Sequence, residues 1–104
     1  MDTMDTLKEI VRRSVFWYAG GGHHLEMYRL SSPDEQVFAV SAVTTSGEYP
    51  AAIVVQARLA GDTIIIDADN TDRPLVERLM AEGIPREKII RAYAGEAVSP
   101  TPQP

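Results

Sequence analysis

Cysteine is absent from this sequence of 104 residues, which excludes disulfide bonds, thiolate catalysis and cysteine-ligated zinc or iron. Long apolar runs are missing too, since no stretch approaches the roughly 18 residues that a helix needs to span a bilayer. The first residues, Met1 to Asp5, have neither the basic flank nor the apolar stretch of a signal peptide. These absences predict a cytoplasmic protein.

Basic residues are scarce: ten Lys and Arg stand against fifteen Asp and Glu, which gives a formal net charge of −5. Phosphate backbones are bound by clustered basic side chains, whereas the basic residues here are interspersed among acidic ones. We therefore expect no direct binding of nucleic acid by the isolated chain. Acidity of this size suits solubility or a basic partner protein.

The remaining composition, 44% hydrophobic and 24% charged, is that of an ordinary folded domain. Apolar residues at helical spacing predict a first helix from Leu7 to Tyr18, with Thr6 and Glu9 as a capping box. The glycines at 20–22 should end this helix.

Four β-branched and apolar runs follow, separated by short turns. Short links between consecutive strands favour an antiparallel meander over parallel βαβ units. We expect the strands at 25–30, 37–45, 52–59 and 63–67.

A second helix is expected from Thr71 or Asp72 to Gly83, with Pro74 in its first turn, followed by a helical turn over 85–88. The fold class is therefore α+β: an N-terminal helix, a four-stranded, mainly antiparallel meander sheet, and a C-terminal helix packed on one face. Residues 1–96 should form this single domain. Residues 97–104, rich in proline, should form a mobile tail.

The acidic segment Asp67–Asp72 is the best candidate for a metal site, because alternate carboxylates can converge on calcium. An EF-hand register from Asp67, however, puts Asp72 where glycine is required and Arg78 where the bidentate glutamate belongs. Capping of the next helix explains the same residue types without a ligand. We therefore predict no metal and no cofactor. The alternative is a small ligand-binding or metal-dependent hydrolytic domain that uses this segment.

Catalytic motifs are not evident. His23 and His24 are adjacent, whereas paired histidine ligands are commonly spaced four residues apart on a helix. The run Thr44 to Gly47 lacks the first glycine of a nucleophile elbow. Since no acid, base and nucleophile can be named together, we expect a non-enzymatic protein.

Three aromatic residues, Phe16, Trp17 and Tyr18, end the first helix. At about 100° per residue they spread over roughly 200°, so they cannot all face the core. Phe16 falls on the charged face beside Arg12 and Arg13, an arrangement typical of binding interfaces. Packing under the chain's own tail, or simple exposure, is the alternative. We expect Phe16, Trp17, Arg12 and Arg13 to bind a partner.

Sheet edges offer a second route to association. The runs 37–45 and 52–59 contain few charges, and an open edge among them could pair with another chain. We therefore expect a homo-oligomer, either a dimer or a tetramer.

The C-terminal half resembles a known family. A strand over 61–67 leads through the acidic segment into a helix, and then come Glu82-Gly83-Ile84-Pro85-Arg86-Glu87-Lys88-Ile89-Ile90 and Tyr93. This order is similar to the XisI family, named for the excision controlling factor of the fdxN element. The resemblance implies an accessory, regulatory role beside XisH, an endonuclease-like partner, in the excision of a DNA element. It supplies no catalytic residues.

Overall fold

The computed structural model describes residues 3–20 and 24–97, so His23 and the proline-rich residues 98–104 lie outside the description. Helices, strands and short 3₁₀ turns alternate along this part of the chain. Their order is α1 (Thr3–Phe16), β1 (Leu25–Ser31), β2 (Val37–Thr44), β3 (Ala52–Ala60), β4 (Thr63–Asp69), α2 (Leu75–Ala81), η1 (Arg86–Lys88), β5 (Ile89–Arg91) and η2 (Ala92–Ala94).

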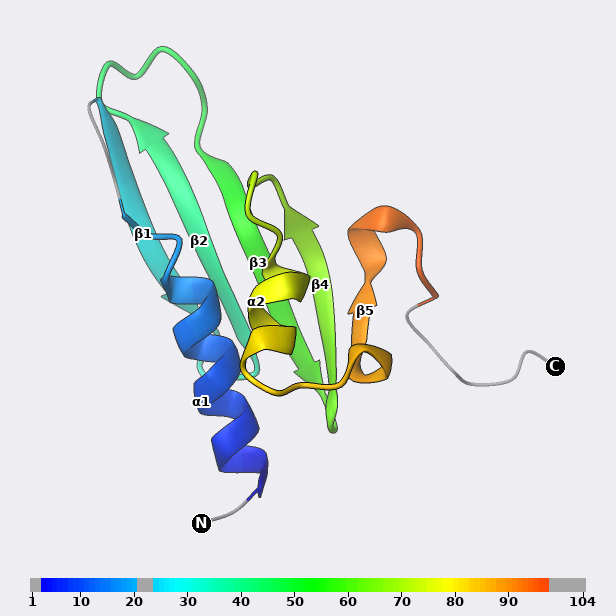
Figure 1. Ribbon diagram of the computed structural model, residues 1–104. Helices are drawn as coiled ribbons and strands as arrows, with labels where there is room; N and C mark the ends of the chain where they lie inside the picture. The colour runs from blue at the N-terminus through cyan, green and yellow to red at the C-terminus, as the bar shows by residue number, and fades with distance from the viewer. Residues whose placement is uncertain (1–2, 21–23, 98–104) are drawn as a thin grey trace, which may run out of the picture.

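The sheet has five strands in the order β1-β2-β3-β4-β5 (Figure 1). The first four strands form the antiparallel meander that the sequence predicts. The expected total of four strands is wrong, because β5 pairs with β4 in parallel, with Ile64 opposite Ile89. A strand of three residues carries too little alternation to be recognised in sequence, and only the return of the chain through α2 places it beside β4.

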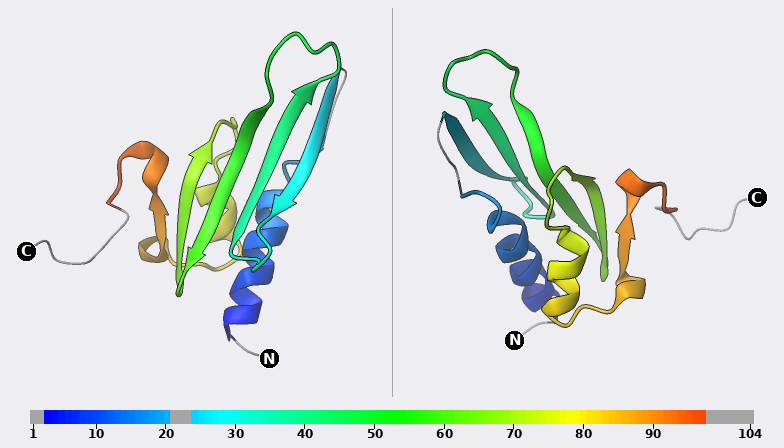
Figure 2. Two further views of the ribbon diagram at one scale, coloured as in Figure 1. Left: turned by 180° about the vertical axis from the view of Figure 1, so that it is seen from behind. Right: turned by 45° about the horizontal axis from the view of Figure 1, so that its top comes forward.

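Both helices cover the same face of the sheet, as predicted, and the view from behind shows the other face without a helix (Figures 1 and 2). The core lies between the helices and the covered face. Its fully buried members are Val11, Val15, Phe38, Val40, Val55, Ala57, Ile64, Ile66, Leu75 and Leu79. None of the described helices is long and apolar enough to cross a membrane.

The helix starts differ from the predicted ones. Helix α1 begins at Thr3, so the predicted capping box of Thr6 and Glu9 is wrong, and the Glu9 carboxylate accepts hydrogen bonds from Arg12 instead. Helix α2 begins at Leu75, later than predicted, because the Asp69 carboxylate accepts the Leu75 N–H at 2.7 Å. That bond holds residues 70–74 as a turn, so Pro74 lies just before the helix and not in its first turn.

Candidate partner-binding surface

The acidic segment Asp67–Asp72 is built into the fold. Asp67 accepts a hydrogen bond from Arg58 at 2.8 Å, and Asp69 accepts both from the Leu75 N–H and from Thr71. In the part of the chain that the structure describes, no three or more His, Asp or Glu side chains are grouped to hold a metal ion. These carboxylates therefore act as acceptors that join β3, β4 and α2.

The described histidine, His24, has a structural position. Its backbone lies in the left-handed region, with φ of 64°, and it directly precedes β1. Its carbonyl accepts a hydrogen bond from the Thr45 N–H at 3.0 Å, which extends the pairing of β1 with β2.

Phe16 does not lie exposed on the charged face of α1, so that expectation is wrong. Its side chain is partly buried and packs against the core, with its ring edge-to-face on Phe38 at a centroid distance of 5.8 Å. Helical periodicity gives the angle of a residue around the helix axis, but it says nothing of a strand lying beside the helix. The ring of Phe38 on β2 fills that place.

Trp17 is the exposed aromatic residue at this end of α1, with 45% of its surface accessible. The guanidinium carbon of Arg78 lies 3.8 Å from the centroid of the Trp17 ring, and that of Arg73 lies 5.8 Å away. Tyr18 contacts the same ring edge-to-face. Cation–π attraction of this kind favours one orientation of the indole while leaving part of it open to solvent.

The two arginines that lie over the Trp17 ring have no ion-pair partner among the described residues. Neither Arg73 nor Arg78 forms an ion pair with a described carboxylate, and the Arg78 Nε is buried without a hydrogen-bond acceptor among the described residues. The described groups closest to their charges are aromatic rings: the indole of Trp17 for both arginines and, for Arg78, also the ring of Tyr18 at 6.0 Å.

A shallow hollow of about 360 Å³ is lined by Trp17 and, in part, by Phe16. Arg12 and Arg13, at its margin, are ion-paired with Glu9 and Glu82 at 2.8 and 2.6 Å. Trp17 belongs both to this hollow and to the cation–π contacts, and we call the combined set the arginine–tryptophan surface: Arg12, Arg13, Phe16, Trp17, Arg29, Arg73 and Arg78.

The structure thus brings together the four residues predicted to bind a partner and adds three arginines that the sequence did not indicate. Arg29 comes from β1 and, like Arg73 and Arg78, has no ion pair with a described residue. No spacing in the sequence links these positions to α1. Only the packing of α1 against the sheet and α2 does so.

Tyr18 fixes the position of this surface on the fold. Its hydroxyl donates a hydrogen bond to the Arg73 carbonyl, which ties the end of α1 to the segment before α2. Burial of the ring, with the nearby negative charge of Asp69, raises the pKa of Tyr18 to about 12. The hydroxyl therefore stays protonated and keeps donating at any physiological pH.

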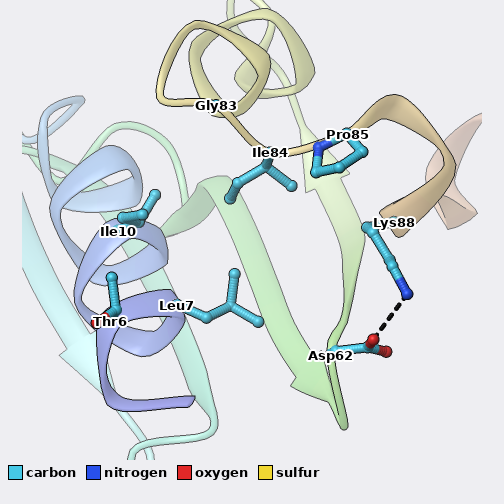
Figure 3. A pocket seen from close by; sticks show the side chains of 8 residues that line it. All are labelled: Thr6, Leu7, Ile10, Asp62, Gly83, Ile84, Pro85 and Lys88. Carbon is cyan, nitrogen blue, oxygen red and sulfur yellow. Dashed lines mark hydrogen bonds and ion pairs between the residues drawn. The ribbon is translucent and has the colours of Figure 1, made fainter. Parts of the chain in front are cut away.

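A second hollow, of about 250 Å³, lies at the opposite end of α1 (Figure 3). Its walls are mainly apolar, from Leu7 and Ile10 of α1 and from Ile84 after α2. At its rim Lys88 and Asp62 are bonded to each other at 2.7 Å, so their charges are already matched. This hollow suits an apolar side chain and presents no group of polar atoms aimed at a common point.

Comparison with known proteins agrees with this fold. The family model described as XisI protein matches residues 1–101. A XisI-like protein from Anabaena variabilis has a similar structure, with a TM-score of 0.76, 20% identity, and coverage of 88% of this chain and 87% of that chain. The structure of the fdxN element excision controlling factor XisI from the same organism is also similar, with a TM-score of 0.71 and 14% identity. The match covers 88% of this chain and 93% of that chain. No curated protein sequence matches. Because the family model spans nearly the whole chain, the protein belongs to the XisI family.

Proposed function

We propose that this protein is a non-enzymatic accessory factor that binds a partner protein through the arginine–tryptophan surface. The partner that family membership favours is an XisH-like, endonuclease-related protein, and the process is the excision or control of a mobile DNA element. The printed name of one relative, fdxN element excision controlling factor, supports this assignment. The expected setting is the cytoplasm.

The chemistry of the surface favours a partner segment that is acidic and carries an apolar side chain. The protein as a whole has a net charge of −5, yet Arg29, Arg73 and Arg78 lack described carboxylate partners. A carboxylate of the partner could pair with these guanidinium groups in the planar, two-bond geometry that arginine offers. The hollow beside Trp17 could take the apolar side chain.

The single observation that carries the proposal is the state of Trp17, which is half exposed yet held against Arg78 at 3.8 Å. Tryptophan and arginine are the residue types that most often dominate the energy of protein interfaces. An aromatic ring that is already oriented loses little conformational entropy on binding. Trp17 therefore has both the exposure and the rigidity of an interface anchor.

The test is to measure the affinity of the XisH-like protein for the wild type and for Trp17→Ala by calorimetry. We expect the variant to bind about 30-fold or more weakly, which corresponds to about 2 kcal/mol. Its melting temperature should change little, because the ring is half exposed.

Tyr49→Ala is the matched control, since Tyr49 is an exposed aromatic residue outside this surface, and its loss should leave the affinity unchanged. Equal affinities for the wild type and for Trp17→Ala would contradict the proposal. A loss of affinity with both variants would point to a nonspecific effect of removing surface aromatics.

A further inference from the structure

The two edges of the sheet differ in their free backbone groups. At the β5 edge, the Ile89 carbonyl accepts a hydrogen bond from Arg86 and the Arg91 N–H donates to Glu96, each at 2.7 Å. Strand β1 forms the other edge and, among the described strands, pairs with β2 alone (Figures 1 and 2). Proteins commonly blunt such edges with proline, lysine, inward-pointing charges or a bulge. Strand β1, with the sequence LEMYRLS and an unbroken register, has no proline, lysine or bulge, and Arg29 is its one charged residue on the helix-covered face.

The pairing of β1 with β2 shows which groups point outward. The Thr45 N–H donates to His24 and the Ser32 N–H donates to Val37, so both of these pairs are of the hydrogen-bonded kind. Bonded and non-bonded pairs alternate along an antiparallel ladder, so the even-numbered residues of β1 bond to β2. The odd-numbered residues direct N–H and C=O away from the sheet: Leu25, Met27, Arg29 and Ser31.

A second copy of the chain can pair with these groups across a two-fold axis perpendicular to the sheet. That symmetry makes the two β1 strands antiparallel and requires odd-numbered residues opposite odd-numbered ones. The register centred on Tyr28 pairs all seven residues of β1 and allows about eight backbone hydrogen bonds. A register centred on Arg29 would leave residues unpaired and would oppose two guanidinium groups.

Side chains favour the same register. Tyr28 and Leu30 are 50% and 44% exposed, respectively, and lie on the face of the sheet without helices. The two Tyr28 residues would occupy a non-hydrogen-bonded pair, where Cα atoms approach to about 4.5 Å and aromatic side chains interact well. Helix α1 packs chiefly on β2 and β3, which lie further inside the sheet than β1.

We propose that two copies of this protein associate through their β1 strands into one continuous sheet with a two-fold axis at Tyr28. The interface is self-complementary, as a two-fold dimer requires. It places the arginine–tryptophan surfaces of both copies on the same face of the joined sheet, and so gives the dimer two equivalent sites. The proposal does not depend on what binds there.

The test is the mass of the full chain in solution, measured by light scattering and sedimentation. The wild type should have about twice the 11.4 kDa mass of one chain. Tyr28→Glu should be monomeric, because it places two carboxylates opposite each other beside Glu26 of both copies. Tyr28→Lys should also be weakened, whereas an equimolar mixture of these two variants should re-form a dimer through opposite charges at the axis. Tyr49→Glu, at an exposed site in the loop after β2, is the control and should remain dimeric.

Hydrogen exchange provides a second readout at the level of the backbone. The outward amides of Met27 and Arg29 should be protected in the wild type and become unprotected on dilution or in Tyr28→Glu. A wild type that is monomeric at all concentrations, or a Tyr28→Glu variant that is folded and still dimeric, would overturn the proposal. Protection that appears only when the XisH-like protein is added would also overturn it and would assign the edge to that partner.

Discussion

At the β5 edge of the sheet, Glu96 accepts a hydrogen bond from the Arg91 N–H and ion-pairs with Arg86 and Arg91. At the β1 side, Arg29 has no ion pair with a described residue, and the outward backbone groups of the strand have no described partner. At the β5 edge, the charged groups are therefore paired with each other within the chain. At the β1 edge, Arg29 and the outward backbone groups have no described partner, so we place both proposed association surfaces on the β1 and α1 side.

The same difference separates arginines that are paired within the fold from the arginines that we propose to bind a partner. Arg86 reaches both the Ile89 carbonyl and Glu96, so its donors are matched within the chain. Arg73 and Arg78 face the Trp17 ring instead. Counting positive charges in an acidic sequence does not reveal this distinction, because it depends on which carboxylates lie within reach.

The largest effect on stability should come from Phe16, which packs the end of α1 against Phe38 of β2. Phe16→Ala removes the edge-to-face contact with Phe38 and should lower the free energy of unfolding by about 2–3 kcal/mol, somewhat less than for a fully buried ring. Trp17→Ala should cost less than about 1 kcal/mol, since half of its ring is exposed. Urea unfolding of both variants measures the contrast. Equal losses of unfolding free energy would contradict the assignment of Phe16 to the core and of Trp17 to the surface.

Asp69 should have the next largest effect. Asp69→Ala removes the acceptor of the Leu75 N–H and of Thr71 and should cost about 2 kcal/mol in unfolding free energy. Thr71→Ala should cost only about 1 kcal/mol, because Asp69 still holds the start of α2. Calcium should not raise the melting temperature of the wild type. A rise of several degrees at millimolar calcium would show that this turn binds metal instead.

Tyr18→Phe tests the hydrogen bond that joins the end of α1 to the segment before α2. The variant loses the hydrogen bond to the Arg73 carbonyl and should be less stable by about 1 kcal/mol at pH 8. The pKa of Tyr18 is raised by burial to about 12, from an ordinary value of 10.0. The wild type should therefore keep its advantage below pH 10.0 and lose it as the pH rises towards about 12. Urea unfolding of both proteins across this range measures the difference, and an advantage that does not change would contradict the assignment.

The smallest effect on stability is expected from Glu96, at the β5 edge of the sheet. Hydrogen bonds from the Arg91 N–H and from Arg86 lower the pKa of Glu96 to about 2, from an ordinary 4.5. The ionised form thus stabilises the fold, fully above pH 4.5, and this contribution is lost as the pH falls towards about 2. Glu96→Gln should be slightly less stable than the wild type at pH 7 and equal to it near the acid limit. Thermal melts at several pH values provide the measurement. A constant difference would mean that the charge of Glu96 is not what closes this edge.

Much of the fold could be predicted from the sequence, because its signals are local. β-Branched and apolar runs joined by short links predicted the four antiparallel strands, and helical spacing predicted both helices. Strand β5 was missed because three residues show no periodicity and its pairing with Ile64 depends on the path of the chain through α2. The start of α2 was misplaced because Asp69, from the preceding strand, decides where this helix begins.

The candidate site was predicted only as far as one helix reaches. Arg12, Arg13, Phe16 and Trp17 share α1 or its end, so their proximity follows from their order in the chain. Arg29, Arg73 and Arg78 come from β1 and from the segment at α2, and only tertiary packing brings them to Trp17. The predicted open edge was also misplaced, since 37–45 and 52–59 correspond to β2 and β3 in the interior of the sheet. The edge strands are β1 and β5.

The central claim, that Trp17 contacts the partner, has a direct test because the sequence contains one tryptophan. Isotope-labelled protein therefore gives a single indole N–H signal in a proton–nitrogen correlation spectrum, and that signal reports on Trp17 alone. Addition of the unlabelled XisH-like protein should shift or broaden this signal, together with the amide signals of Arg73 and Arg78. An indole signal that stays unchanged while the complex forms would contradict the account and move the interface elsewhere on the molecule.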